Sequence, residues 1–146
     1  GTGSDEAIIA HKQVVIERGL KRHGSRADLT ALLAFGGREQ AAICGAVIAA
    51  RMASVPVILD GFICSAAVAP LYGMIPDSLD HCLVGHVSAE PGHKHLLAAM
   101  DKSAILQLDM RLGEGTGAAV ALSILRGAAA CHNQMATFES AGIAGT

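Results

Sequence analysis

A single carboxylate, Glu114, lies within a cluster of three glycines in the stretch 110-MRLGEGTGAAVALSIL-125. A glycine-rich turn before a helix commonly receives an anion, because the first amide N–H groups of a helix have no partners within it. A carboxylate in such a turn repels an anionic ligand. Two interpretations therefore stay open: Glu114 faces away from a bound phosphate, or the turn serves different chemistry.

The sequence neighbours of Glu114 are mostly apolar, since Met110 and Leu112 precede it and the run AAVAL follows. Apolar surroundings make a carboxylate hold a proton more readily, and a general base that works near neutrality needs this property. The alternative is an acidic N-cap of the following helix, where the helix dipole stabilises the charged form. The pattern leaves both interpretations open.

The same turn matches the dinucleotide-binding pattern G-x-G-x-x-G/A at Gly113, Gly115 and Ala118, and Glu139 lies about where that pattern's ribose-binding acid is expected. After the predicted helix only a short tail remains, which is too little for the strand that would hold this acid. The first variable position is also acidic and would face the pyrophosphate. We therefore disfavour a nucleotide-cofactor site.

A second anion site is suggested at the start of the chain by Gly1, Thr2, Gly3 and Lys12. The amides of a glycine turn together with a lysine form a credible phosphate cradle. The alternative, a solvated lysine on a helix surface, stays open.

Three histidines, His86, His93 and His95, lie near Cys82. Their spacing, H-x6-H-x-H, matches no common zinc frame, and no paired cysteines complete it. His93 and His95 are two residues apart on a predicted helix and so do not share a face. We expect no metal site and interpret these side chains as surface or loop histidines near a polar site. A Ser–His–Asp triad is disfavoured because no G-x-S-x-G elbow is present.

Three short apolar runs predict the strands that must position these residues: 55–60, expected to be a central strand, 81–87 and 104–112. Helical segments alternate with them, which predicts right-handed crossovers. We expect an α/β fold with a Rossmann-like parallel sheet flanked by helices, forming an incomplete portion of a larger domain. Ligands bind at the carboxyl ends of such strands. The loops there are 60–61, 88–90 and 113–115.

The helices are predicted from caps and breakers. Ser4 is expected to cap the first helix, Ser25 or Asp28 to start a short second one that Gly36 stops, and Pro91 to begin the fifth at its first turn. The helix over 38–53 carries small residues on several faces, so we expect it to be buried on more than one side. The remaining predicted helices are 8–20, 29–35, 62–70 (ended by Pro70) and 115–138.

The overall composition fits a single α/β domain spanning residues 1–146, with 51% hydrophobic and 3% aromatic residues. A net charge of −2 without a basic tract argues against nucleic-acid binding. The most apolar runs fall short of the roughly 20 residues that cross a bilayer, so we expect no membrane association. The cysteines are far apart and predict buried thiols of a cytoplasmic protein: Cys44, Cys64, Cys82 and Cys131.

Four stretches together resemble one family: VPVILDGF, HVSAEPGH, LDMRLGEGTGAA and NQMATFESAGI. Over essentially its whole length the chain is similar to nicotinate-nucleotide–dimethylbenzimidazole phosphoribosyltransferase, which makes the lower-ligand nucleotide of cobalamin. The resemblance implies an enzyme, a pentosyltransferase, that transfers the 5-phosphoribosyl group of nicotinate mononucleotide to 5,6-dimethylbenzimidazole with inversion at the anomeric carbon. The implied products are nicotinate and α-ribazole 5′-phosphate, and no metal or redox cofactor is implied.

The resemblance also implies roles for individual residues. The glutamate of the family motif R-L-G-E-G-[ST]-G is the general base, so Glu114 would take the ring N–H proton of the aromatic base while its other nitrogen attacks the ribose. The glycines would leave room for a flat bicyclic ring. The implied substrate-binding residues are Gly1, Thr2, Gly3, Lys12 and Ser88 at the phosphate, and Leu112, Gly113 and Gly115 in the motif.

The resemblance covers the C-terminal part of a longer family chain, whose stretch E-M-G-I-G-N-T-T lies upstream of residue 1. Family members are homodimers, and we expect the same association here. Three hypotheses stay open: an enzyme that is weakly active or inactive alone, a non-catalytic half or assembly module that needs an N-terminal segment, and a phosphoribosyltransferase for another aromatic base.

Overall fold

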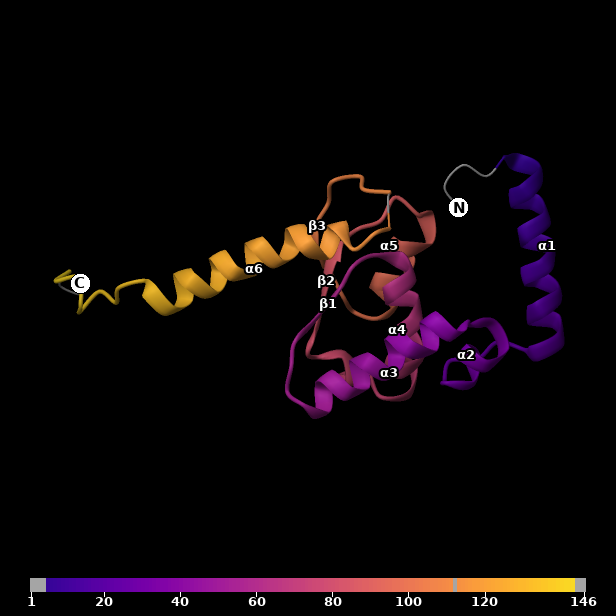
Figure 1. Cartoon of the computed structure of the whole chain (residues 1–146), viewed down its shortest axis with the longest axis horizontal. Helices are drawn as coiled ribbons and strands as arrows, with labels where there is room; N and C mark the ends of the chain where they lie inside the picture. The colour runs from indigo at the N-terminus through magenta and orange to yellow at the C-terminus, as the bar shows by residue number, and fades with distance from the viewer. Residues whose placement is uncertain (1–4, 112, 144–146) are drawn as a thin grey trace.

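The computed structural model of the chain describes residues 5–111 and 113–143. Helices and strands alternate from β1 onward, after three helices at the start (Figure 1). In chain order the elements are α1 (Glu6–His23), α2 (Thr30–Phe35), α3 (Arg38–Met52), β1 (Val57–Leu59), α4 (Phe62–Met74), the 3-10 helix η1 (Pro76–Leu79), β2 (Cys82–His86), α5 (Pro91–Ala99), β3 (Ala104–Leu106) and α6 (Thr116–Gln134).

The three strands form one parallel sheet in the order β1-β2-β3, which confirms the predicted α/β class. Val57 lies opposite Cys82 in the first pair, and Val84 lies opposite Ala104 in the second. The prediction of a central strand at 55–60 is wrong for the described residues, because β1 is an edge and β2 pairs on both sides. Four of the five residues of β2 are buried, as a central strand requires.

The third strand is shorter than predicted, since β3 covers only three residues of the run 104–112. Asp109 adopts a left-handed backbone with φ of 50°, which an extended strand does not tolerate. Beyond β3 the chain still accompanies the end of β2, because the Ala89 amide donates to the carbonyl of Met110 at 3.1 Å.

The apolar core lies between the sheet and helices α3, α4 and α5. Leu59 of β1 and Val84 of β2 pack with Val68 of α4 and Leu97 of α5, and all four side chains are buried. Helix α6 begins against β2, where Gly85 leaves room for it: a Cβ on Gly85 would lie 3.0 Å from the amide nitrogen of Ala118. The first turn of α6 is therefore fixed at the carboxyl end of the sheet.

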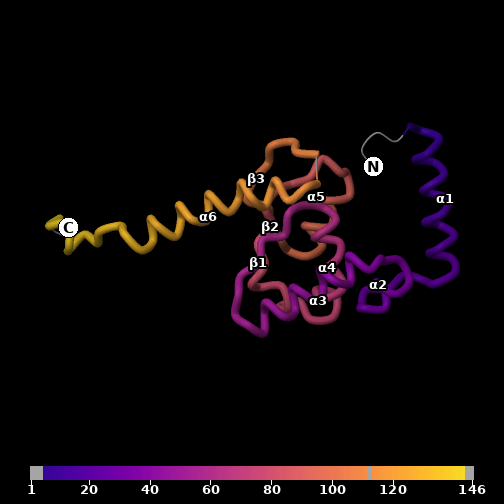
Figure 2. The backbone as a smooth tube through the Cα atoms, viewed as in Figure 1, coloured from indigo at the N-terminus to yellow at the C-terminus, as the bar shows by residue number. Residues whose placement is uncertain are grey.

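Two helices extend away from this core, as the tube in Figure 2 shows. Helix α1 lies apart from the sheet on one side of the molecule, and the second half of α6 projects from the opposite side. α1 carries no buried residue, and the buried residues of α6 are Gly117 and Ala121 in its first half. None of the helices within 5–111 and 113–143 has the length and apolarity to cross a bilayer.

Several predicted helix details are wrong. Asp5, whose carboxylate accepts from the Ile8 amide at 2.8 Å, caps α1, whereas the predicted cap Ser4 lies outside the described residues. α4 continues through Pro70 to Met74, because packing of its buried face outweighs the one backbone hydrogen bond that proline removes. α6 ends at Gln134, before the predicted 138. Pro91 does begin α5, as predicted.

Burial also differs from the prediction in two places. α3 buries only Cys44 and Val47, which lie three residues apart, so it packs along one stripe rather than on several sides. Cys82 is buried like Cys44, but Cys131 is exposed on the outer half of α6. Burial raises the pKa of the Cys44 and Cys82 thiols, which keeps them unreactive.

Candidate functional site

A cavity of about 510 Å³ opens at the carboxyl ends of β1 and β2. This volume lies in the range of sites for small organic ligands. The three loops expected to meet there do so, because each contributes lining residues. The lining consists of Asp60, Gly61, Phe62, Ile63, Cys64, His86, Ser88, Glu90, Arg111 and Gly113.

A smaller cavity of about 260 Å³ adjoins the same loop. Ser88 and Glu90 line both cavities, so the loop 88–90 forms their shared wall. Lys94 of α5 lines the smaller one. The position of this loop therefore sets the shape of both spaces.

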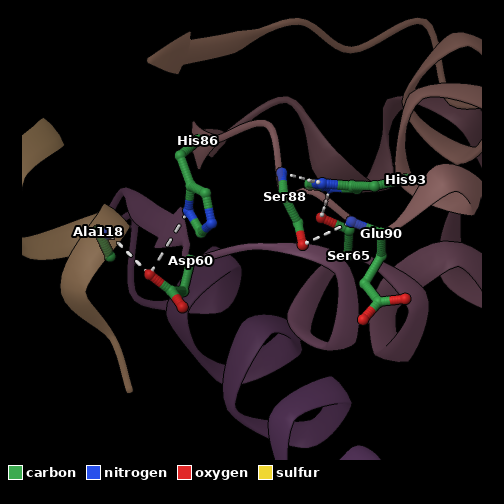
Figure 3. A network of polar contacts seen from close by, with 7 residues as sticks. All are labelled: Asp60, Ser65, His86, Ser88, Glu90, His93 and Ala118. Atoms are coloured by element: carbon green, nitrogen blue, oxygen red, sulfur yellow. Dashed lines mark hydrogen bonds and ion pairs between the residues drawn. The ribbon is translucent and has the colours of Figure 1, made fainter. Parts of the chain in front are cut away.

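Asp60, the residue that follows β1, ties the sheet to the start of α6. One carboxylate oxygen, Oδ1, accepts a hydrogen bond of 2.9 Å from the amide of Ala118. The helix N-terminus needs such an acceptor, because its first amides have no intrahelical partner. The carboxylate thus fixes the helix that follows the glycine turn, and Figure 3 shows this contact between Asp60 and Ala118.

His86, the last residue of β2, packs against two glycines. A Cβ on Gly117 would lie 1.9 Å from Nδ1 of His86, and a Cβ on Gly61 would lie 2.7 Å from its Cε1. His86 is 2% exposed, and its Nδ1 lies 3.8 Å from Oδ1 of Asp60, beyond hydrogen-bond distance. Gly117 is therefore needed for this imidazole, whereas the resemblance implied that the glycines make room for a ligand ring.

A second buried histidine, His93 of α5, supports the loop 88–90. Its Nδ1 accepts from the Ser88 amide at 2.9 Å, and its Nε2 lies 3.1 Å from Oγ of Ser65 on α4. Burial lowers the pKa of His93, and the neighbouring His86 lowers it further. The ring therefore stays neutral at physiological pH. The prediction that His86 and His93 are surface or loop histidines is wrong, because both are almost fully buried.

Glu114 lies on the exposed turn that follows the lining residue Gly113. The alternative of an N-cap role is wrong, because Gly115 occupies the N-cap of α6. Gly115 has φ of +75°, a left-handed conformation that glycine adopts without strain. The exposure of Glu114 also contradicts the expected apolar surroundings within the described residues. Its role as general base stays a prediction.

The predicted phosphate residues are only partly placed. Ser88 lines both cavities and is half-buried. Lys12 lies on α1, which contacts α2, and is not among the described residues that line either cavity. Gly1, Thr2, Gly3 and Leu112 lie outside the described residues, so their roles stay predictions.

Four contributors to the site were not predicted as such from the sequence: His86, His93, Ser65 and Arg111. His86 lies in the predicted strand 81–87, and His93 lies in the helix predicted to begin at Pro91. Their burial could not be predicted, because it depends on contacts with residues distant in sequence. Arg111 precedes the glycine turn and brings a positive charge to the cavity lining. Within residues 5–111 and 113–143, no cluster of His, Cys, Asp or Glu has the geometry of a metal site.

The fold and the site define an α/β protein with a cavity of small-molecule size at the ends of its parallel strands. Residues 1–143 match the model of the family described as Phosphoribosyltransferase, DBI_PRT. The chain belongs to this family.

Several relatives share one name, nicotinate-nucleotide–dimethylbenzimidazole phosphoribosyltransferase. The chain is 58% identical over 143 residues to the protein of this name from Rhodobacter capsulatus, covering 98% of this chain and 43% of the relative. It is 52% identical over 148 residues to the one from Brucella anthropi, covering 100% of this chain and 44% of the relative.

Two solved structures from Thermus thermophilus share the fold at 39% identity. One, of nicotinate-nucleotide–dimethylbenzimidazole phosphoribosyltransferase, has a TM-score of 0.87 over 97% of this chain and 43% of its own. The other, of CobT, has a TM-score of 0.89 over 100% of this chain and 44% of its own. The chain thus spans less than half the length of these relatives, and its expected place in the C-terminal part stays a prediction.

Proposed function

We propose that this chain forms part of a phosphoribosyltransferase site that transfers the 5-phosphoribosyl group of nicotinate mononucleotide to 5,6-dimethylbenzimidazole. The observation that carries the proposal is the cavity at the strand ends, lined by the loops 60–61 and 88–90 and by Gly113 of the glycine turn. The names of the relatives supply the two substrates. The cavity is large enough for a mononucleotide or an aromatic base.

In the proposed reaction Glu114 acts as the general base. One ring nitrogen of dimethylbenzimidazole attacks the anomeric carbon of the ribose, the bond from that carbon to nicotinate breaks, and nicotinate leaves with the electron pair. The N–H proton of the other ring nitrogen passes to the Glu114 carboxylate, which prevents positive charge from accumulating on the base. The exposed position of Glu114 next to the lining residue Gly113 supports this role, because the carboxylate is accessible to a bound ring.

Anionic groups of the nucleotide would be held by polar residues of the same lining. Ser88 offers a hydroxyl, and Arg111 offers a planar cation that pairs well with a phosphate or carboxylate. The phosphate cradle of Gly1, Thr2, Gly3 and Lys12 remains part of the proposal from the sequence. Ser88 and Arg111 can bind these anionic groups directly, without a metal ion between them.

The proposal is tested by replacing the matched segment of the Rhodobacter capsulatus relative with this chain, using their 58% identity over 143 residues as the basis for the exchange. Free nicotinate and α-ribazole 5′-phosphate are measured by chromatography. We expect both products in equal amounts. A folded chimaera that forms neither product contradicts the proposed function.

The share of the relatives that the chain spans, 43–44%, favours one second candidate: a non-catalytic half that completes a site with another segment. The isolated chain is assayed beside the chimaera. Activity that is present in the chimaera and absent from the isolated chain supports the second candidate. Activity of the isolated chain excludes it. Competition with adenine and phenolic acceptors distinguishes a transferase for another aromatic base.

We further propose a homodimer in the cytoplasm. The exposed apolar side chains on α1 and α6, such as Ile16 at 59% and Ile124 at 47% exposure, support self-association. The four free cysteines suit a reducing compartment. Light scattering of the purified chain is expected to give twice the mass of one chain, and a monomer mass at micromolar concentration contradicts the dimer.

A further inference from the structure

The loop 88–90 is held from two sides by hydrogen bonds of alternating direction. The amide of Val87 donates to the carbonyl of Leu106 in β3 at 2.9 Å, and the amide of Ala89 donates to the carbonyl of Met110, in the segment after β3, at 3.1 Å. The intervening amide of Ser88 points the other way, as successive amides of an extended segment do. It donates to Nδ1 of His93 at 2.9 Å.

The contact with Ser88 fixes the protonation state of the His93 ring. A ring nitrogen that accepts from an amide N–H carries no proton, so the proton of the neutral ring lies on Nε2. Nε2–H therefore donates to Oγ of Ser65, 3.1 Å away. His93 and Ser65 are both 0% exposed, so neither has water as an alternative partner.

This direction of donation excludes a nucleophilic role for Ser65. A serine nucleophile needs a histidine nitrogen that accepts its proton, whereas Nε2 of His93 already carries one. The pair instead connects α4, through Ser65, to the loop that forms the wall of both cavities (Figure 3). Phe62, which lines the larger cavity, packs against the same imidazole with 5.8 Å between ring centroids.

We propose that His93 is a positioning residue of the site: its neutral Nε2–H tautomer bridges Ser65 and the Ser88 amide and thereby fixes Ser88 and Glu90 in the cavity wall. The Ser88 hydroxyl extends the same support, because its Oγ accepts from the Glu90 amide at 3.3 Å. The consequence for turnover rests on the proposed function, whereas the bridge itself does not.

The bridge is tested directly by NMR on the unaltered chain. We expect a scalar coupling between the amide nitrogen of Ser88 and Nδ1 of His93, transmitted through their hydrogen bond, and a ring proton on Nε2. A ring proton on Nδ1, or no coupling under conditions where Nε2–H is seen, overturns the proposal.

Two variants, each of which mimics one nitrogen of the ring, separate its two ends. The side-chain oxygen of His93→Asn takes the place of Nδ1 and keeps an acceptor for Ser88, whereas the amide nitrogen of His93→Gln takes the place of Nε2 and keeps a donor for Ser65. The Ser88 amide loses its hydrogen bond in His93→Gln, so we expect it to exchange its proton roughly five- to tenfold faster in this variant than in the parent chain. In His93→Asn the amide keeps an acceptor, so we expect its exchange rate to stay within about twofold of the parent rate.

The Val87 amide, which β3 holds, is the internal control and is expected to exchange at the parent rate in both variants. Equal acceleration of Ser88 in both variants, or none in His93→Gln, overturns the proposal. In the active chimaera the same comparison predicts a several-fold higher KM for nicotinate mononucleotide in His93→Gln than in His93→Asn. An inactive chimaera contradicts the proposed function, while coupling and exchange still decide the bridge.

Discussion

Two regions meet at the carboxyl ends of the strands, and they differ in how their polar side chains are held. Beneath the cavity, His86, His93 and Ser65 are at most 2% exposed and contact residues from several elements. The glycine turn that carries Glu114 is exposed, and a Cβ on Gly113 or Gly115 would contact none of the described atoms within 4 Å.

The difference assigns separate tasks to the two regions. Buried polar groups have few alternative partners, so they hold the loops and the first turn of α6 in fixed positions. An exposed carboxylate on an uncrowded turn contributes little to the fold and is accessible to a ligand. We infer that the buried network supports the site and that the turn supplies the proposed chemistry.

The largest loss of stability among scaffold variants is expected for Gly117→Ala. The added Cβ would lie 1.9 Å from Nδ1 of His86, and the resulting strain exceeds the gain of about 1 kcal/mol that alanine brings to a helix. We expect the free energy of unfolding, measured in urea, to fall by about 2 kcal/mol. Gly113→Ala is the matched control and is expected to change it by less than about 0.5 kcal/mol. Equal losses would remove the contrast between the two regions.

Asp60→Ala is expected to cost about 1–2 kcal/mol of unfolding free energy, because the Ala118 amide at the start of α6 loses its acceptor. Asp60→Asn keeps an acceptor oxygen in the same place, so a smaller loss is expected. Urea unfolding of both variants checks this. An Asn variant as unstable as the Ala variant would show that the hydrogen bond to Ala118 is not the stabilising contact.

Gly115→Ala is expected to cost about 1 kcal/mol, because a residue with a Cβ is strained at φ of +75°. Gly115→Asn is expected to cost less, since asparagine tolerates this conformation better. The unfolding free energies of the two variants are compared with that of the parent chain. If both variants match the parent chain, the left-handed turn is not a constraint.

The smallest expected effect is a pH dependence that arises from His93. Burial lowers the pKa of this histidine in the folded chain below the usual value of 6.5, which applies to the unfolded chain. At a pH between the pKa of the folded chain and 6.5, the unfolded chain therefore binds a proton that the folded chain does not. Its contribution to stability is therefore complete above pH 6.5 and falls as the pH drops below that value. His93→Asn is expected to lose this part of the slope, measured as unfolding free energy from pH 7 downward. An identical slope in both proteins contradicts the neutral buried ring.

Local patterns in the sequence predicted much of the fold. They also predicted the glycine turn 113–115 at the site. The apolar runs and Pro91 located the strands and α5, because such signals lie within a few residues. Contacts between distant residues could not be predicted this way. Asp60 and Ala118 are 58 positions apart, and Ser65 and His93 are 28 apart, so nothing nearby in the sequence marks these side chains as supports. Packing likewise carried α4 through Pro70 against the local signal.

The central claim, that the exposed turn supplies the chemistry and the buried network supplies the support, is tested most directly by Glu114→Gln in the chimaera. Turnover and unfolding free energy are measured on the same preparation, with Glu90→Gln, the other glutamate beside the cavity, as the matched control. We expect turnover to fall roughly 10²- to 10⁴-fold in Glu114→Gln, as the loss of a general base predicts, with unfolding free energy within about 0.5 kcal/mol of the parent. Undiminished turnover in Glu114→Gln would contradict the account. So would a roughly 10²- to 10⁴-fold loss of turnover that appears in Glu90→Gln and not in Glu114→Gln.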